Sequence, residues 1–250
     1  MRRSPVVIAG LVVSSALAGS ACGGGSPSQP VAAYVQFGGS ESDVVLRDSL
    51  LEQFERAVLP PMAEAEATVV VGVAGDRTST APVLIGTADF ADAIAEAEGN
   101  SMVEADNVAS MRMELLDETT AGLLSYPPSA TSDTVSGLAL ATQVRQQMTV
   151  DTEFRVVLLG DAISTTESCN LLLIDLSTPA ARSTAIDACT RGLLIDLDDV
   201  AVVMGGAGVD PDDALSPERA GQIELFYREL IERFGGELRV YAAELVTEVE

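Results

Sequence analysis

The sequence contains no histidine, no lysine and no tryptophan, and all 14 of its basic residues are arginine. Without histidine, the chain cannot build a Ser-His-Asp triad or a histidine-ligated metal site. Without lysine, it cannot form a Schiff base or supply the phosphate-binding lysine of a P-loop. These absences exclude most familiar enzyme chemistries.

Positive charge is scarce as well, because the 14 basic residues stand against 38 acidic ones and the formal net charge is −24. Nucleic-acid binding draws its affinity from clustered cations, so we expect no nucleic-acid partner. The length of 250 residues and the hydrophobic content of 47% are sufficient for one folded domain of good size. The composition therefore predicts a globular protein.

The first 21 residues have the pattern of an export signal. Arg2 and Arg3 are followed by an apolar stretch over residues 6–18 that is too short for a comfortable membrane span. The small residues before Cys22 resemble a bacterial lipobox, in which the cysteine is diacylated after cleavage with chains such as palmitate. Gly19 stands where leucine is commonest in that motif. The alternative is a secreted protein with an ordinary cleavage site.

Residues 22–30 are rich in Gly, Ser and Pro and predict a flexible tether after the lipid-modified Cys22. No later run reaches 18 apolar residues, so the mature chain would be held in the membrane through lipid alone. We therefore expect a signal peptide at 1–21, a tether at 22–30 and a domain at 31–250, on the extracytoplasmic face of the cell membrane.

Cys169 and Cys189 remain as an even pair once Cys22 is assigned to lipidation. Outside the cytoplasm, such a pair with no CxxC spacing and no histidine nearby favours a disulfide over a metal or redox site. The alternative is two free, buried thiols.

The first half of the domain has the pattern of a βαβ unit. An apolar strand is predicted over residues 31–37 and a β-branched strand over 68–74, with an amphipathic helix between them. Ser40 or Ser42 can cap this helix, and Pro60-Pro61 is expected to end it.

Further elements follow at the spacing of an α/β protein. We expect helices near 102–125, from about Ser132 to Met148, and from the Ser216 cap to Gly235-Gly236, with strands at 154–159, 200–204 and 238–241. A short strand near 83–85 leads to a loop or helix, and the apolar runs 171–176 and 192–197 stay unassigned. Alternating strands and helices predict a three-layer α/β sandwich with a doubly wound, mostly parallel sheet.

Ligands of such sheets gather at the carboxyl ends of the strands, which are here residues 36–40, 129–134 and 161–165. The order of a DxSxS-like turn, an amphipathic helix, the segment VVVGVAGDRTST, a Thr/Ser-Asp turn and a strand ending in Asp resembles the von Willebrand factor A (VWA) domain over about residues 31–243. The chain is most similar to small bacterial lipoproteins that carry one such domain.

The resemblance implies a Mg²⁺ or Mn²⁺ site built from the DxSxS turn, a hydroxyl of a second loop and an aspartate of a third. Here Gln36 replaces the first Asp, Gly38 replaces the first Ser, and Ser40 remains. Ser132 takes the second-loop position, with Thr131 and Thr134 as alternates, and Asp161 takes the third. Hard cations need several oxygen ligands, so we expect this degenerate site not to bind a metal tightly.

Purely structural roles also account for these residues, because Ser40 and Ser132 can cap helices and Asp161 can accept hydrogen bonds from loop amides. Other acidic motifs are weaker candidates. Asp76 to Thr80 keeps a DxTxT pattern, residues 193–200 resemble the Asp196-containing nucleophile motif of haloacid-dehalogenase-type phosphatases, and Asp210 to Asp213 could attract Ca²⁺.

We therefore expect a lipid-anchored, non-catalytic VWA-like binding module that recognises a protein or envelope component. Its partner-binding residues would be Gln36, Ser40, Ser132, Thr134 and Asp161. The alternatives are a metal-dependent hydrolase that uses Asp161 or Asp196, and a structural envelope lipoprotein without a dedicated site.

Overall fold

The computed structural model describes residues 29–75, 83–148, 152–209 and 215–245. The expected signal peptide at 1–21, Cys22 and nearly all of the tether lie outside the described residues. The DxTxT loop at 76–80 and the acidic run at 210–213 lie outside them too.

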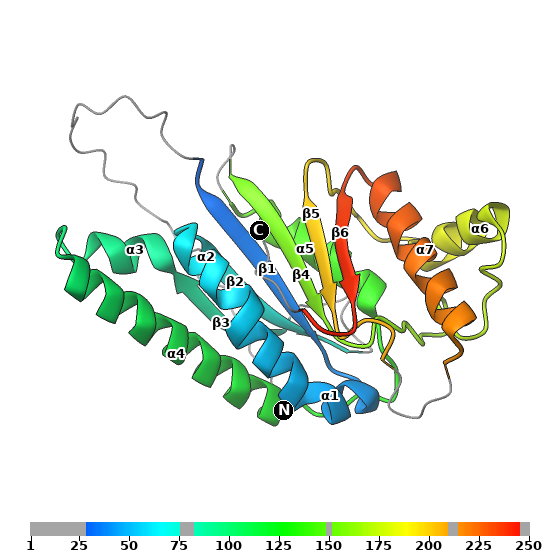
Figure 1. The fold of residues 1–250 in the computed structure, drawn as a ribbon. Coiled ribbons are helices and arrows are strands. Elements are labelled where there is room, and N and C mark those ends of the chain that lie inside the picture. The colour runs from blue at the N-terminus through cyan, green and yellow to red at the C-terminus, as the bar shows by residue number, and fades with distance from the viewer. Residues whose placement is uncertain (1–28, 76–82, 149–151, 210–214, 246–250) are drawn as a thin grey trace, which may run out of the picture.

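A six-stranded sheet, counted over the described residues, has the order β3-β2-β1-β4-β5-β6 (Figure 1). Neighbouring strands run parallel except for the edge pair of β2 and β3. The fold class predicted from the sequence, a mostly parallel α/β sandwich, is therefore confirmed. The strands are β1 (Val31–Gly38), β2 (Thr68–Ala74), β3 (Val83–Asp89), β4 (Glu153–Leu159), β5 (Ala201–Gly205) and β6 (Glu237–Ala242).

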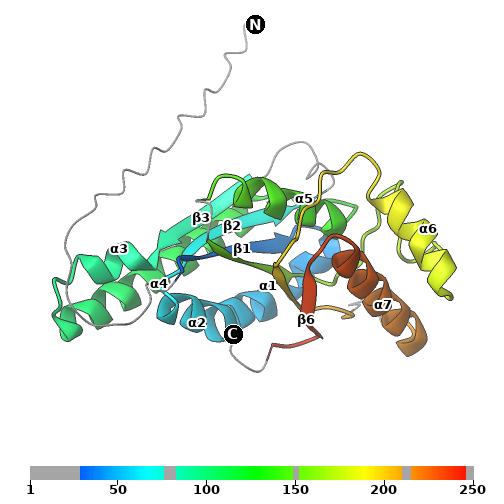
Figure 2. The same cartoon turned by 90° about the horizontal axis from the view of Figure 1, so that it is seen from above.

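Helices cover both faces of the sheet, which makes three layers (Figure 2). Strand β1 shows why, because Ala33, Val35 and Phe37 enter one hydrophobic core while Ala32 and Tyr34 enter the other. The first core is covered by α1 (Glu41–Gln53), the π-helical turn η1 (Phe54–Val58), α2 (Leu59–Glu64), α3 (Phe90–Ala95) and α4 (Ser101–Ser125). The second is covered by α5 (Thr134–Arg145), α6 (Pro179–Cys189) and α7 (Pro217–Arg233).

The first helix does not end at Pro60-Pro61, as the sequence predicted. At η1 the chain widens by one residue, and the amide of Leu59 donates to the carbonyl of Phe54. This lets a new helix start at Leu59 with both prolines in its first turn, where backbone amides have no partner within the helix. The structure therefore corrects the predicted helix end.

Three other predictions are refined. Helix α5 is capped by Asp133 and not by Ser132, and it ends at Arg145 and not at Met148. The strand near 83–85 extends to Asp89 and leads to a helix, α3. The apolar runs 171–176 and 192–197 form neither helix nor strand.

No helix in the described part of the chain has both the length and the apolar character needed to cross a membrane.

A disulfide joins Cys169 to Cys189, at the end of α6, as the sequence predicted. Their Cα atoms lie 4.6 Å apart and 20 positions separate them in the sequence. Both sulfur-bearing residues are buried in the core beneath α6 and α7. The bond therefore ties the irregular segment after β4 to the second helical layer.

Replacing both Cys169 and Cys189 by Ser should lower the free energy of unfolding by about 3 kcal/mol, because a closed loop of this size removes chain entropy from the unfolded state. Urea unfolding with and without reductant measures the effect. Reductant should shift the wild-type midpoint and leave that of the double variant unchanged. An equal midpoint for the reduced and oxidised wild type would contradict the prediction.

Candidate functional site

Three loops meet at the carboxyl ends of β1 and β4, and we call this surface the rim (residues 38–43, 129–134 and 160–165). The amide of Ser129 donates to the carbonyl of Gly39 at 2.9 Å, and the amide of Glu41 donates to the carbonyl of Ser129 at 3.0 Å. The second and third loops are joined by the amide of Thr165, which donates to the carbonyl of Ser132 at 2.9 Å. The strand order thus brings together segments far apart in the sequence.

The strand-end turn begins two residues later than its sequence register suggested, because β1 continues to Gly38. Gln36 consequently lies inside the strand and is only 2% exposed. Its side chain sits beneath α5, where a Cβ on Gly137 would come within 2.2 Å of it. Residue alternation along β1 turns Gln36 inward, where it lines a small cavity with Ser132 and Thr134 and offers a partner almost no surface.

With this register, Gly38-Gly39-Ser40-Glu41-Ser42 takes the place of the DxSxS-like turn, with Gly38 at the position of the Asp. Both serines are present. The Ser40 hydroxyl lies 2.8 Å from that of Ser42, and the Ser42 hydroxyl donates to Asp161 at 2.6 Å. The turn therefore keeps its two hydroxyls and has a glycine where the pattern has an aspartate.

Asp43 supplies a carboxyl group that the sequence analysis missed. It is 2% exposed and is the third residue of α1, where it forms a capping box with Ser40. The amide of Ser40 donates to it at 3.0 Å and the amide of Asp161 at 3.1 Å. The Ser-x-x-Asp spacing of a capping box was visible in the sequence, but the contact with Asp161 was not.

Asp161 is 3% exposed and is separated from the end of β4 by Gly160 alone. One of its carboxylate oxygens accepts the hydroxyl of Ser42, and the other accepts the amide of Ile163 at 2.8 Å. Its carbonyl accepts the amide of Gly208 at 3.0 Å. Asp161 thus joins the loops after β1, β4 and β5.

A chain of oxygen atoms links the two aspartates. Asp43 and Ser40 are 2.5 Å apart, Ser40 and Ser42 are 2.8 Å apart, and Ser42 and Asp161 are 2.6 Å apart. The Ser40 hydroxyl donates to Asp43, the Ser42 hydroxyl donates to Asp161, and the two hydroxyl oxygens lie within hydrogen-bond distance of each other. Burial raises the pKa of the Asp43 carboxyl, and the hydrogen bonds from Ser40 and from the amide of Asp161 offset only part of this rise.

Ser132 and Thr134 lie beside this chain, at the start of α5. Their hydroxyl oxygens are 3.5 Å apart, and the amide of Ser132 donates to the hydroxyl of Thr165 at 2.9 Å. Both residues, with Gly38 and Gly160, line a cavity of about 10 Å³. That volume is near the minimum for one water molecule.

The donor set does not fit a divalent cation. Each carboxylate oxygen of Asp43 and Asp161 already accepts a hydrogen bond from an amide or a hydroxyl. Within residues 29–75, 83–148, 152–209 and 215–245, no group of three or more Asp, Glu, Cys or His side chains is arranged to hold a metal ion. A small cation such as Mg²⁺ would need several of these oxygens at about 2.0–2.1 Å in octahedral geometry.

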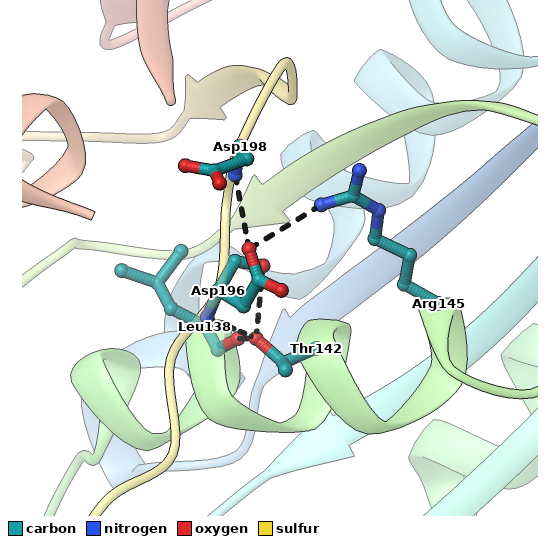
Figure 3. Close-up of polar contacts among 5 residues, drawn as sticks. All are labelled: Leu138, Thr142, Arg145, Asp196 and Asp198. Atoms are coloured by element: carbon teal, nitrogen blue, oxygen red, sulfur yellow. Dashed lines mark hydrogen bonds and ion pairs between the residues drawn. The ribbon is translucent and has the colours of Figure 1, made fainter. Parts of the chain in front are cut away.

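Asp196 precedes the start of β5, at the opposite end of the strand from the rim, and lies beside Thr142 and Arg145 of α5 (Figure 3). Its carboxylate accepts the amide of Asp198 at 3.2 Å and lies 3.7 Å from the guanidinium of Arg145. Its amide donates to the hydroxyl of Thr142 at 2.9 Å. Residues 193–197 form no strand, so the hydrophobic strand that precedes the nucleophile in the phosphatase motif is missing here.

No protein-family model and no curated protein matches this sequence. Among solved structures, three N-terminal domains of the type V pili tip protein of Porphyromonas gingivalis match 54% of this chain and 20% of theirs, at 11% identity and a TM-score of 0.36. The pilus adhesin SpaC of Lactobacillus rhamnosus GG matches 85% of this chain and 28% of its own, at 13% identity and a TM-score of 0.42.

Manganese-loaded TRAP protein of Plasmodium vivax matches 87% of this chain and 69% of its own, at 10% identity and a TM-score of 0.41. The chain spans less than a third of the length of the two pilus proteins.

Substituting Gly38 by Ala should destabilise the protein by about 1–3 kcal/mol, the usual cost of overpacking. The new Cβ would lie 2.2 Å from the carboxyl carbon of Asp43. Gly221→Ala is the matched control, because it lies in α7 with no atom within 4 Å of its Cβ position, and Ala is the better helix former. Urea unfolding of both variants tests this, and equal stabilities would contradict it.

Proposed function

We propose that this protein is a non-catalytic VWA-like binding domain, displayed on the outer face of the cytoplasmic membrane by a lipid on Cys22. The rim would bind a protein or envelope component. The observation that carries the proposal is the meeting of three loops at the carboxyl ends of the parallel strands, which is where such sheets place their ligands.

The exposed part of the rim differs from the residue set expected from the sequence. Ser40, Ser132 and Asp161 are each less than 5% exposed, so they would shape the loops and not touch a partner directly. Thr134 is half-buried, as are Ser42 and Thr131 on the neighbouring turns. A partner would therefore meet these three residues and the exposed Glu41.

A non-catalytic role is supported by the chemistry of the rim. Its serines have no histidine or lysine to act as a base, because the whole sequence contains neither. The carboxylates of Asp43 and Asp161 are occupied by hydrogen bonds that hold the loops together. The hydrolase alternative would need Asp161 to give up these bonds, and Asp196 has a carboxylate bound to a neighbouring amide.

A photoreactive benzoylphenylalanine at Thr134 should form a covalent complex with the partner in intact cells. The same residue at Leu173 or Leu194 should not, although these side chains are 82% and 65% exposed. Immunoblotting for a shifted band measures the result. Crosslinks from Leu173 or Leu194 alone would show that the partner binds at another surface and not at the rim. The absence of a crosslink at all three positions would favour a structural envelope role.

Lipid anchoring predicts that Cys22→Ser moves the protein from the membrane fraction to the soluble extracytoplasmic fraction, because the acyl chains supply the membrane affinity. Cell fractionation followed by detergent phase partitioning measures this. The Cys169→Ser, Cys189→Ser double variant is the matched control and should stay in the membrane fraction. Membrane association of Cys22→Ser would contradict the anchor.

A further inference from the structure

The space beside Gly38, at the end of β1, is occupied by the side chain of another residue, Asp43. A Cβ on Gly38 would lie 2.2 Å from Cγ and Oδ2 of Asp43 and 2.4 Å from Oδ1. The space that a side chain at position 38 would occupy is thus taken by the carboxyl group of Asp43. In the VWA pattern that this sequence resembles, position 38 corresponds to the aspartate of the DxSxS turn.

Contacts from two loops hold Asp43 in this place. Its Oδ2 accepts the amide of Ser40 at 3.0 Å, and its Oδ1 accepts the amide of Asp161 at 3.1 Å. A Cβ on Gly160 would come within 2.9 Å of Oδ1, so the loop after β4 also leaves room for it. One carboxyl group therefore links the ends of β1 and β4, and its oxygens point at amides of the protein.

We infer that Asp43 is an internal substitute for the strand-end aspartate, a positioning residue that closes the rim by hydrogen bonds in place of a divalent cation. Any ligand of the rim is therefore bound without Mg²⁺ or Mn²⁺. This inference concerns how the rim is held together, and it stands or falls independently of whether the proposed partner exists.

Relocating the carboxyl group tests the substitution. Gly38→Asp alone should be strongly destabilising, because its side chain enters the space of Asp43. In the Asp43→Ala background the same change should be tolerated, since alanine has no γ atom in that space. Urea unfolding of the two single variants and the double variant gives the coupling between the positions. If the two single changes add strictly in their effects on the free energy of unfolding, the inference about Asp43 is wrong.

Manganese binding gives the second readout, measured with MnCl₂ by the loss of the electron paramagnetic resonance signal of free Mn²⁺. The parent protein should leave the signal of millimolar Mn²⁺ unchanged. The Gly38→Asp, Asp43→Ala variant should bind one Mn²⁺ per chain and show a saturable rise in melting temperature. The Gly38→Asn, Asp43→Ala variant is the matched control and should bind none.

Mn²⁺ binding by the parent protein tests the inference even if the double variant does not fold. One Mn²⁺ bound per parent chain, and lost in both Asp43→Asn and Asp161→Asn, would overturn the claim that the rim is closed without a cation. A double variant that folds with native circular dichroism and still binds no Mn²⁺ would also overturn it. Loss of crosslinking from Thr134 would bear on the proposed function and leave this result untouched.

Discussion

The carboxyl group of Asp43 is the contact on which the rim depends. It lies at the start of α1 and binds the amides of Ser40 and Asp161, so it fixes the end of β1 against the end of β4. A buried carboxyl is costly unless its oxygens are satisfied, and here amides and a hydroxyl satisfy them. The glycines at 38 and 160 leave the space that makes this arrangement sterically possible.

The sequence analysis assigned one set of residues both to the rim itself and to contact with a partner. In the structure, different residues are placed for these two roles. Ser40, Ser132 and Asp161 are buried, and each forms hydrogen bonds to other parts of the rim. The neighbouring Ser42 and Thr134 are half-buried and can meet a partner. Binding at this surface would then depend on loop shape, on hydroxyl groups and on the exposed Glu41, while the carboxyl groups of Asp43 and Asp161 stay in the interior.

Individual elements differ in how well the sequence predicted them. Helix α7 was clear because Ser216 and Pro217 mark its start and a long apolar face follows. Helix α6 begins with the same kind of signal, Thr178 and Pro179, yet it was not assigned. It is short and lies between two ambiguous apolar runs. The antiparallel pairing of β3 could not be predicted, since strand direction depends on which neighbour a strand meets.

The sequence by itself determined the fold class, most of the strands and helices, and the pairing of Cys169 with Cys189, because periodicity and cysteine spacing are local or composition-based signals. Only the tertiary structure decided the register of the strand-end turn, the burial of Gln36 and the position of the Asp43 carboxyl. These depend on distances between segments more than a hundred residues apart, as the bond from Asp161 to Asp43 shows, and no local pattern encodes which side chain fills the space left by a glycine.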